Sequence, residues 1–208
     1  MRRERVRRRK ETDMARVLLG IIAVFVLVGG YSIFQFRDRM SSARLGSDVT
    51  YTLDAQGNAS VLVVNKSYFV NDDTARNFDG MAARLGRPSA ESYQKSVEES
   101  LKNLSERTGR HFQVADFEAS FDRQPEYGAQ VYRFRWTGFA EWRDGAWVVD
   151  FKGANTVRLN KDSSLTVVLP AGSTLVKAEP APSGDHSSGR LVWKGWAEMP
   201  WPYIEYRP

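Results

Sequence analysis

Residues 49–70 read VTYTLDAQGNASVLVVNKSYFV, and this stretch decides the fold class. Apolar and polar side chains alternate on both sides of the turn sequence QGN at 56–58. Alternation with a period of two predicts a strand with one buried face, and a glycine-containing turn between two such runs predicts a β-hairpin. We therefore expect residues 49–54 and 60–70 to pair as antiparallel strands.

The same alternation returns in the second half of the chain. In residues 130–139 the aromatic side chains of Tyr132, Phe134 and Trp136 alternate with polar neighbours. An Asp-Gly turn at 144–145 leads into residues 147–151, which we expect to pair with that strand. Many short strands separated by Gly, Pro, Ser and Asp predict an antiparallel sandwich or a large twisted sheet. The strands expected in this half are 112–121, 130–139, 147–151, 156–159, 164–169, 174–178, 190–194 and 203–206.

Between these β segments the pattern becomes helical. Apolar side chains recur at helical spacing after Asp72 and stop at Gly86, and Pro88 opens a second stripe that ends before Gly109. Glycine past the last turn and proline in the first turn are the usual ends of helices. The sequence therefore predicts an α+β domain, mainly antiparallel β, with a two-helix insertion at 72–108.

Residues 17–36 read VLLGIIAVFVLVGGYSIFQF, twenty residues without a charge. At about 1.5 Å per residue this run spans roughly 30 Å, the thickness of the bilayer hydrocarbon, so it predicts one transmembrane helix. Cleavage as a signal peptide after the small residues at 41–43 is the alternative. The apolar run is longer than the usual 7 to 15 residues, and charges at 37–39 separate it from that site, which favours an uncleaved anchor.

Charge near the two ends of this run predicts its direction. The first sixteen residues hold eight of the 30 Lys and Arg and three of the 25 Asp and Glu, so 22 of each sign remain in the rest of the chain. Because Lys and Arg concentrate on the cytoplasmic side, we expect residues 1–16 inside and the carboxyl-terminal domain outside. The expected organisation is a basic cytoplasmic tail at 1–16, a transmembrane helix at 17–36, a juxtamembrane linker at 37–47 and an extracytoplasmic β-rich domain at 48–208.

The basic tail suggests its partner. Beside a membrane helix, a cluster of basic residues is attracted to anionic lipid headgroups. We expect this contact from Arg7, Arg8, Arg9 and Lys10. Since the remainder of the chain is neutral, a folded nucleic-acid-binding face is not expected.

No motif for metal, cofactor or nucleophilic chemistry emerges. The chain has no cysteine and two widely spaced histidines, which excludes thiolate sites and disulfides and argues against a metal or other cofactor. Paired carboxylates on strands would allow glycoside hydrolysis, so a cell-envelope hydrolase stays open as the alternative function. The carboxylates near expected strands are Glu118, Asp122, Glu126, Glu141, Asp144 and Asp150.

Aromatic residues crowd the carboxyl-terminal segment 193–206. Prolines and a glycine interrupt it, so we expect some rings to stay partly exposed and to serve in binding. The candidates are Trp196, Trp201, Tyr203 and Tyr206. The alternative is a purely structural role, in which the segment closes the sandwich. We also expect the ring of Trp142, near the 144–145 turn, to be exposed, which makes it a further candidate platform for a sugar or a peptide.

Three N-x-Ser sequons, at Asn58, Asn65 and Asn103, are candidate N-glycosylation sites and fit an extracytoplasmic location.

Five segments carry a family resemblance: YTLDAQGNASVLV (51–63), RTGRHFQVADFEAS (107–120), YRFRWTGFAEW (132–142), SLTVVLPAGSTLVKAEPAP (164–182) and LVWKGW (191–196). In order and type they resemble membrane-anchored extracytoplasmic domains of unknown function in archaea, especially haloarchaea and methanogens. The resemblance implies membrane anchoring and carries over no catalytic residue. Together with the residue patterns it predicts a non-enzymatic interaction domain whose partner is a protein or an envelope component.

Overall fold

The computed structural model describes residues 44–151, 156–184, 186–195 and 197–208. Within them the chain forms one long helix and twelve strands. The helix is α3 (Asp72–Thr108). The strands are β1 (Arg44–Leu53), β2 (Ala59–Tyr68), β3 (Gln113–Arg123), β4 (Tyr127–Thr137), β5 (Glu141–Arg143), β6 (Ala146–Val149), β7 (Val157–Leu159), β8 (Ser164–Val168), β9 (Thr174–Glu179), β10 (Arg190–Lys194), β11 (Ala197–Met199) and β12 (Tyr203–Arg207).

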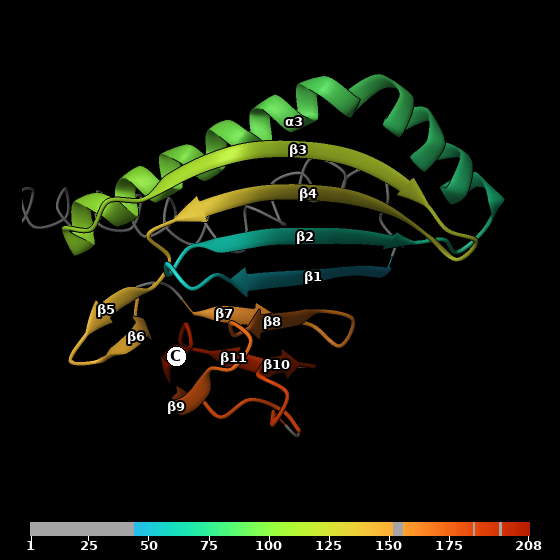
Figure 1. Ribbon diagram of the computed structural model, residues 1–208. Helices are drawn as coiled ribbons and strands as arrows, with labels where there is room; N and C mark the ends of the chain where they lie inside the picture. The colour runs from blue at the N-terminus through green and yellow to red at the C-terminus, as the bar shows by residue number, and fades with distance from the viewer. Residues whose placement is uncertain (1–43, 152–155, 185, 196) are drawn as a thin grey trace, which may run out of the picture.

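Six strands form the larger sheet, in the order β10-β8-β1-β2-β4-β3. The predicted hairpin is β1–β2, with Val49 opposite Val63 and Tyr51 opposite Val61. Neighbours run antiparallel except β1 and β8, which are parallel, with Tyr51 opposite Val167. The mainly antiparallel β content of the prediction is therefore confirmed, and Figure 1 shows this sheet as a long twisted surface beside α3.

Where two helices are expected, α3 runs unbroken from Asp72 to Thr108. Its first turn is closed by a capping box between Asn71 and Thr74, and it ends at Gly109 in the left-handed conformation. The expected break at Pro88 lies inside the helix, which is bent in Figure 1. A proline inside a helix lacks one N–H donor and commonly bends the axis, and here packing along the sheet keeps both halves helical.

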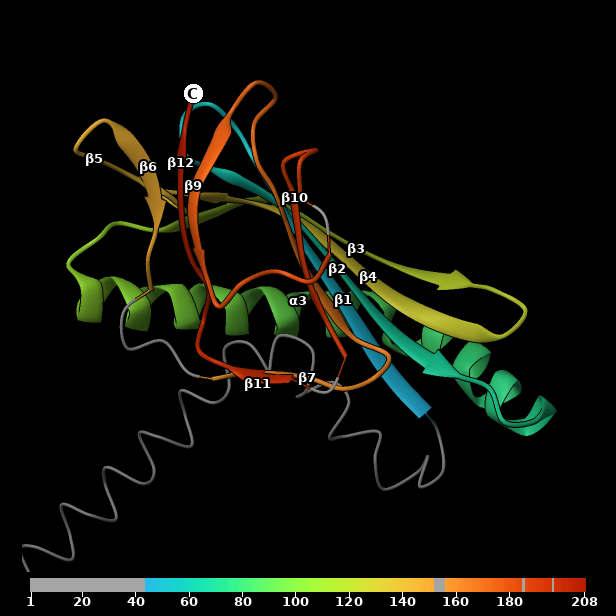
Figure 2. The same cartoon turned by 90° about the horizontal axis from the view of Figure 1, so that it is seen from below.

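One face of the larger sheet carries the core. In β4, Tyr132, Phe134 and Trp136 are buried while Arg133 between them is exposed, as the alternation predicts. The Tyr132 ring stacks on Tyr93 of α3 with ring centroids 3.8 Å apart. Figure 2 shows α3 and the β7–β11 pair on the same side of the sheet, and we call the face that they cover the inner face.

The amino-terminal half of α3 approaches the sheet closely at Gly128 of β4. A Cβ atom at this position would lie within 3.0 Å of three carbons of the Phe78 ring. Phe78 is buried and also packs edge-on against Phe69 and Phe121, each with ring centroids 6.0 Å apart. Glycine is required here because the ring lies directly on the strand backbone.

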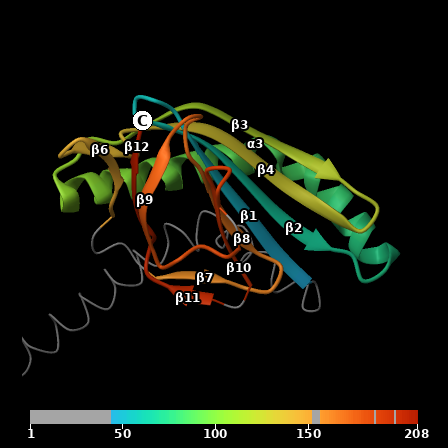
Figure 3. The same ribbon diagram turned by 60° about the horizontal axis from the view of Figure 1, so that its bottom comes forward.

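The smaller sheet has the strand order β5-β6-β12-β9. The Asp144-Gly145 turn is present, with φ of 50° and 82°. The expected pairing of residues 147–151 with 130–139 is wrong, because a two-residue turn pairs the residues next to it, here Arg143 and Ala146. β6 instead pairs with β5 and β12. Figure 3 shows β9 and β12 next to β10, where they close the other side of the core.

The described residues contain no helix that is long and apolar enough to cross a membrane. The predicted tail at 1–16 and the predicted transmembrane helix at 17–36 lie outside the described residues, as does most of the predicted linker. The domain begins slightly earlier than expected at 48, since β1 starts at Arg44.

Candidate functional site

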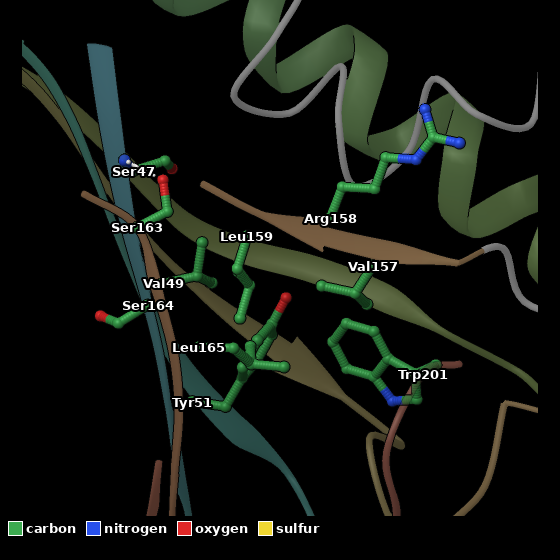
Figure 4. A pocket seen from close by; sticks show the side chains of 10 residues that line it. All are labelled: Ser47, Val49, Tyr51, Val157, Arg158, Leu159, Ser163, Ser164, Leu165 and Trp201. Atoms are coloured by element: carbon green, nitrogen blue, oxygen red, sulfur yellow. Dashed lines mark hydrogen bonds between the residues drawn. The ribbon is translucent and has the colours of Figure 1, made fainter. Parts of the chain in front are cut away.

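A cavity of about 60 Å³ lies on the inner face, between the larger sheet and β7. Strands β1 and β8 form its floor, β7 forms one wall, and Trp201 closes one side (Figure 4). Its lining side chains are Ser47, Val49, Tyr51, Val157, Arg158, Leu159, Ser163, Ser164, Leu165 and Trp201. The parallel pairing of β1 with β8 creates this site, because it brings together residues that are more than a hundred positions apart.

One end of the cavity is polar, but its hydroxyl protons are already used. Ser47 Oγ donates to Asn65 Oδ1 at 2.8 Å, and Ser163 Oγ donates to Asn160 Oδ1 at 2.8 Å. Ser164 Oγ donates to a carboxylate oxygen of β1 at 2.6 Å. The backbone N–H of Ser47 is also satisfied, by Ser163 Oγ at 3.0 Å. These serines can therefore offer lone pairs but no further proton.

Tyr51 lies at the opposite, apolar end. Its side chain is 3% exposed, stacks on Phe139 with ring centroids 4.9 Å apart and meets Trp201 edge-on at 5.7 Å. Within the described residues its hydroxyl makes no hydrogen bond. Figure 4 shows this hydroxyl directed between Leu159 and Val157. Burial raises the pKa of the phenol well above its ordinary value, so the proton stays on the oxygen and is available to an acceptor.

The cavity interior carries no charged group among the described residues. The Arg158 guanidinium is exposed, turns away from the cavity in Figure 4 and pairs with Glu198 of β11 at 3.1 Å. Only the stem of Arg158 thus belongs to the wall. The arrangement can hold a neutral group, but its described side chains offer no nucleophile activated by a base and no metal ligands.

The predicted aromatic segment does not form one surface. Trp201 is 8% exposed and faces the cavity. Tyr203 is half-buried on the smaller sheet, and its hydroxyl donates to Glu205 at 3.1 Å. Tyr206 is fully buried in the core, which contradicts its predicted role in surface binding; it points inward because β12 is an internal strand with Ile204 and Tyr206 on its core side. Trp196 lies outside the described residues.

Trp142 is the exposed aromatic of the smaller sheet, at 51% exposure. It lies opposite Trp147 across the β5–β6 hairpin, with ring centroids 5.4 Å apart. Trp147 in turn covers Gly57, whose φ of 77° and lack of a side chain leave room for the ring. Cross-strand aromatic pairs stabilise short hairpins, so Trp142 has a structural role whether or not it binds a partner.

The three sequons differ in accessibility. Asn103 is exposed on α3. The Asn58 amide donates to Asp54 at 3.0 and 3.3 Å and its oxygen accepts from the Gly138 N–H, so it is engaged in the β1–β2 turn. Asn65 is 4% exposed on the inner face, which contradicts its candidacy: a glycan on the buried amide has no space in the folded domain.

The candidate hydrolytic carboxylates do not meet at the cavity. All six are described, and none lines it. Glu118, Asp122, Glu126 and Asp144 are exposed. Glu141 and Asp150 both pair with Arg143, at 2.6 and 3.3 Å. The hydrogen bond from Arg143 lowers the pKa of Glu141, whereas a general acid needs a raised pKa. Among the described residues no cluster of His, Asp and Glu could hold a metal ion.

Several residues of the cavity escape prediction from sequence. The alternation identifies Tyr51 as a core residue, but nothing in the sequence indicates how its hydroxyl is placed. Leu159 belongs to the expected strand 156–159 and Ser163 directly precedes the expected strand 164–169, but no pattern indicates that either residue faces β1. Both residues lie near β8 in the sequence, and this is the only feature they share. The pairing of β8 with β1, which places them at the cavity, has no local pattern that predicts it.

The fold and the cavity together define a β-rich α+β domain in which a long helix and a smaller sheet close one face of a six-stranded sheet. Residues 45–207 match the family described as Domain of unknown function (DUF4897), and the chain belongs to this family. The match begins one residue after the start of β1 and ends with β12, so the family is coextensive with the folded domain. No curated protein matches the chain.

Proposed function

We propose that this DUF4897 protein is a single-pass membrane protein whose carboxyl-terminal domain acts outside the membrane as a non-enzymatic binding domain. The partner is a protein or an envelope component, and the cavity beneath β1 and β8 receives part of it. The observation that carries the proposal is the cavity itself, largely apolar and uncharged, with the hydroxyl of the buried Tyr51 side chain directed between two of its aliphatic walls.

The anchor part of the proposal rests on the sequence. The uncharged run at 17–36 is long enough to span a bilayer, and eight basic residues precede it. The tail, with Arg7, Arg8, Arg9 and Lys10, would then face anionic lipid headgroups on the cytoplasmic side. Membrane anchoring outside an archaeal cell is also what the family resemblance implies, and the proposal adopts it.

Protease treatment of intact cells tests the location. A tag at the amino terminus should survive, while a tag placed after Pro208 should be removed together with the outer domain. Opening the cells should expose the amino-terminal tag. If both tags are protected in intact cells, the proposed orientation is wrong.

Site-specific photocrosslinking in native membranes tests binding at the cavity. A photoreactive residue in place of Arg158 stands at the cavity rim on β7, and one in place of Arg133 stands on the opposite face of the larger sheet. Both positions are exposed arginines on strands, so they are matched. We expect a discrete adduct from position 158 and none from position 133. Equal labelling from both positions would count against the cavity as the binding site.

A further inference from the structure

We propose that the cavity selects a neutral, compact aliphatic group of about four to six heavy atoms that carries one hydrogen-bond acceptor, and that this acceptor accepts a hydrogen bond from the Tyr51 hydroxyl. The inference rests on the proposed function, since it names the chemical class of the group that the binding domain receives. It follows from the size of the cavity, the lack of a charged group among its described interior walls, and the one hydroxyl proton that its described lining leaves uncommitted.

Size sets the upper limit. The cavity measures about 60 Å³, and one water-sized atom needs about 10 to 15 Å³ on the same measure. The site therefore holds roughly four to six heavy atoms. That is the size of a branched amino-acid side chain or a short ketone or amide, the part of a partner that the cavity would enclose.

The described interior walls offer no countercharge, so an ionised ligand group is not expected there. The Arg158 guanidinium is exposed and already paired with Glu198, so it gives no countercharge inside the cavity. The interior walls next to Tyr51 are aliphatic or aromatic, among them Val157 and Leu165. A carboxylate or an ammonium group would lose its hydration there without compensation.

The hydroxyl groups that line the cavity indicate that the ligand carries a hydrogen-bond acceptor. The hydroxyl protons of Ser47, Ser163 and Ser164 are committed to oxygen atoms of the domain. Among the described lining residues the uncommitted hydroxyl proton is that of Tyr51, whose side chain is buried and whose hydroxyl points between Val157 and Leu159. A bound water needs two to four polar partners, and these two aliphatic neighbours provide none. A ligand with one acceptor and an alkyl body satisfies both requirements.

Two sources share this chemistry: a small free molecule, and an aliphatic side chain of a peptide together with its backbone carbonyl. Butanone represents the first and N-acetyl-leucinamide the second. Butanoate adds a charge, and 2-methylbutane lacks the acceptor. Binding of each probe to the full-length chain in detergent would be measured by ligand-detected saturation-transfer NMR, with protein-free detergent as the blank.

We expect butanone to bind, and butanoate and 2-methylbutane to bind at least tenfold more weakly. Binding of N-acetyl-leucinamide as well assigns the natural group to a peptide, and its failure beside butanone binding assigns it to a small molecule. The variant Tyr51→Phe removes only the hydroxyl, so it should fold like the parent and lose at least fivefold in butanone affinity. The second variant, Val157→Phe, fills the cavity and should abolish binding of every probe.

Butanoate binding as tightly as butanone, or unchanged butanone affinity in Tyr51→Phe, would overturn the proposed ligand class. If photocrosslinking from position 158 still succeeds in that case, the binding function stands and only the ligand class is wrong. If neither the probes nor the crosslinker find the cavity, both proposals fail together.

Discussion

Replacement of Gly128 by alanine tests how α3 is held on the larger sheet. The new Cβ would lie within 3.0 Å of three ring carbons of Phe78, where ordinary contacts are 3.4 to 4 Å. The nearest ring carbon would lie only 2.4 Å away, so the ring must move by about 1 Å to reach an ordinary contact, or leave its rotamer. Overpacking of this kind costs about 1 to 3 kcal/mol of the free energy of unfolding.

A double-mutant cycle isolates that contact. Phe78→Ala alone should cost about 3 to 5 kcal/mol, because it removes a buried ring. In the Phe78→Ala background the obstacle is gone, so Gly128→Ala should cost less than about 0.5 kcal/mol. Gly80→Ala is the control: this glycine lies in the same helix, and a methyl group added to it would meet no heavy atom within 4 Å. Alanine there should stabilise the domain by up to about 1 kcal/mol.

Urea denaturation of the full-length chain in mild detergent, followed by tryptophan fluorescence, measures these effects. All six tryptophans lie between residues 136 and 201, so the signal reports on the folded domain. With a slope of about 1 to 3 kcal/mol per molar urea, a loss of about 2 kcal/mol moves the midpoint by roughly 1 M. An unchanged midpoint for Gly128→Ala, or an equal loss in both backgrounds, would refute the close approach of helix and sheet.

Three further outcomes follow from the surface of the domain. Trp142→Ala should cost up to about 1 kcal/mol in the same urea assay, since it removes one cross-strand aromatic pair; a larger loss would mean that the ring is buried by more than the hairpin. The hydrogen bond from Arg143 lowers the pKa of Glu141 in the folded state, so its stabilisation is complete above the ordinary value of 4.5 and is lost as the pH falls through the folded value. Glu141→Gln should accordingly flatten the fall in stability below about pH 4.5, and an unchanged pH profile would contradict this pairing. In a host that adds N-glycans, peptide mass spectrometry of the folded protein should find glycan at Asn103 and none at Asn65.

Local patterns in the sequence predict much of this fold. The β1–β2 hairpin is confirmed because alternation and turn chemistry are both local, and the same holds for the inward aromatics of β4. Short strands are harder to predict. The sequence analysis misses β5 and β11, because three residues are too few to show the two-residue alternation of a strand. The continuity of α3 is missed because packing on the sheet outweighs the local effect of Pro88.

The candidate site depends on contacts that sequence does not encode. Trp201 and Tyr206 belong to the same aromatic segment, yet one faces a cavity and the other is fully buried. Their difference is set by the strands beside them, since β12 lies inside the smaller sheet and Trp201 precedes it. Likewise, the apolar surroundings of the Tyr51 hydroxyl depend on β7, more than a hundred residues away.

The place of β1 in the larger sheet has a mechanical consequence for a tethered protein. The proposed anchor leads into Arg44, and β1 is bonded along its length to β2 on one side and, over residues 48–52, to β8 on the other. A pull on the anchor therefore loads the hydrogen bonds of two neighbouring strands together, along the strand direction, instead of peeling an edge strand away one bond at a time. If the proposed anchor and partner are correct, the domain can thus bear tension between them without unravelling from the end at which it is held.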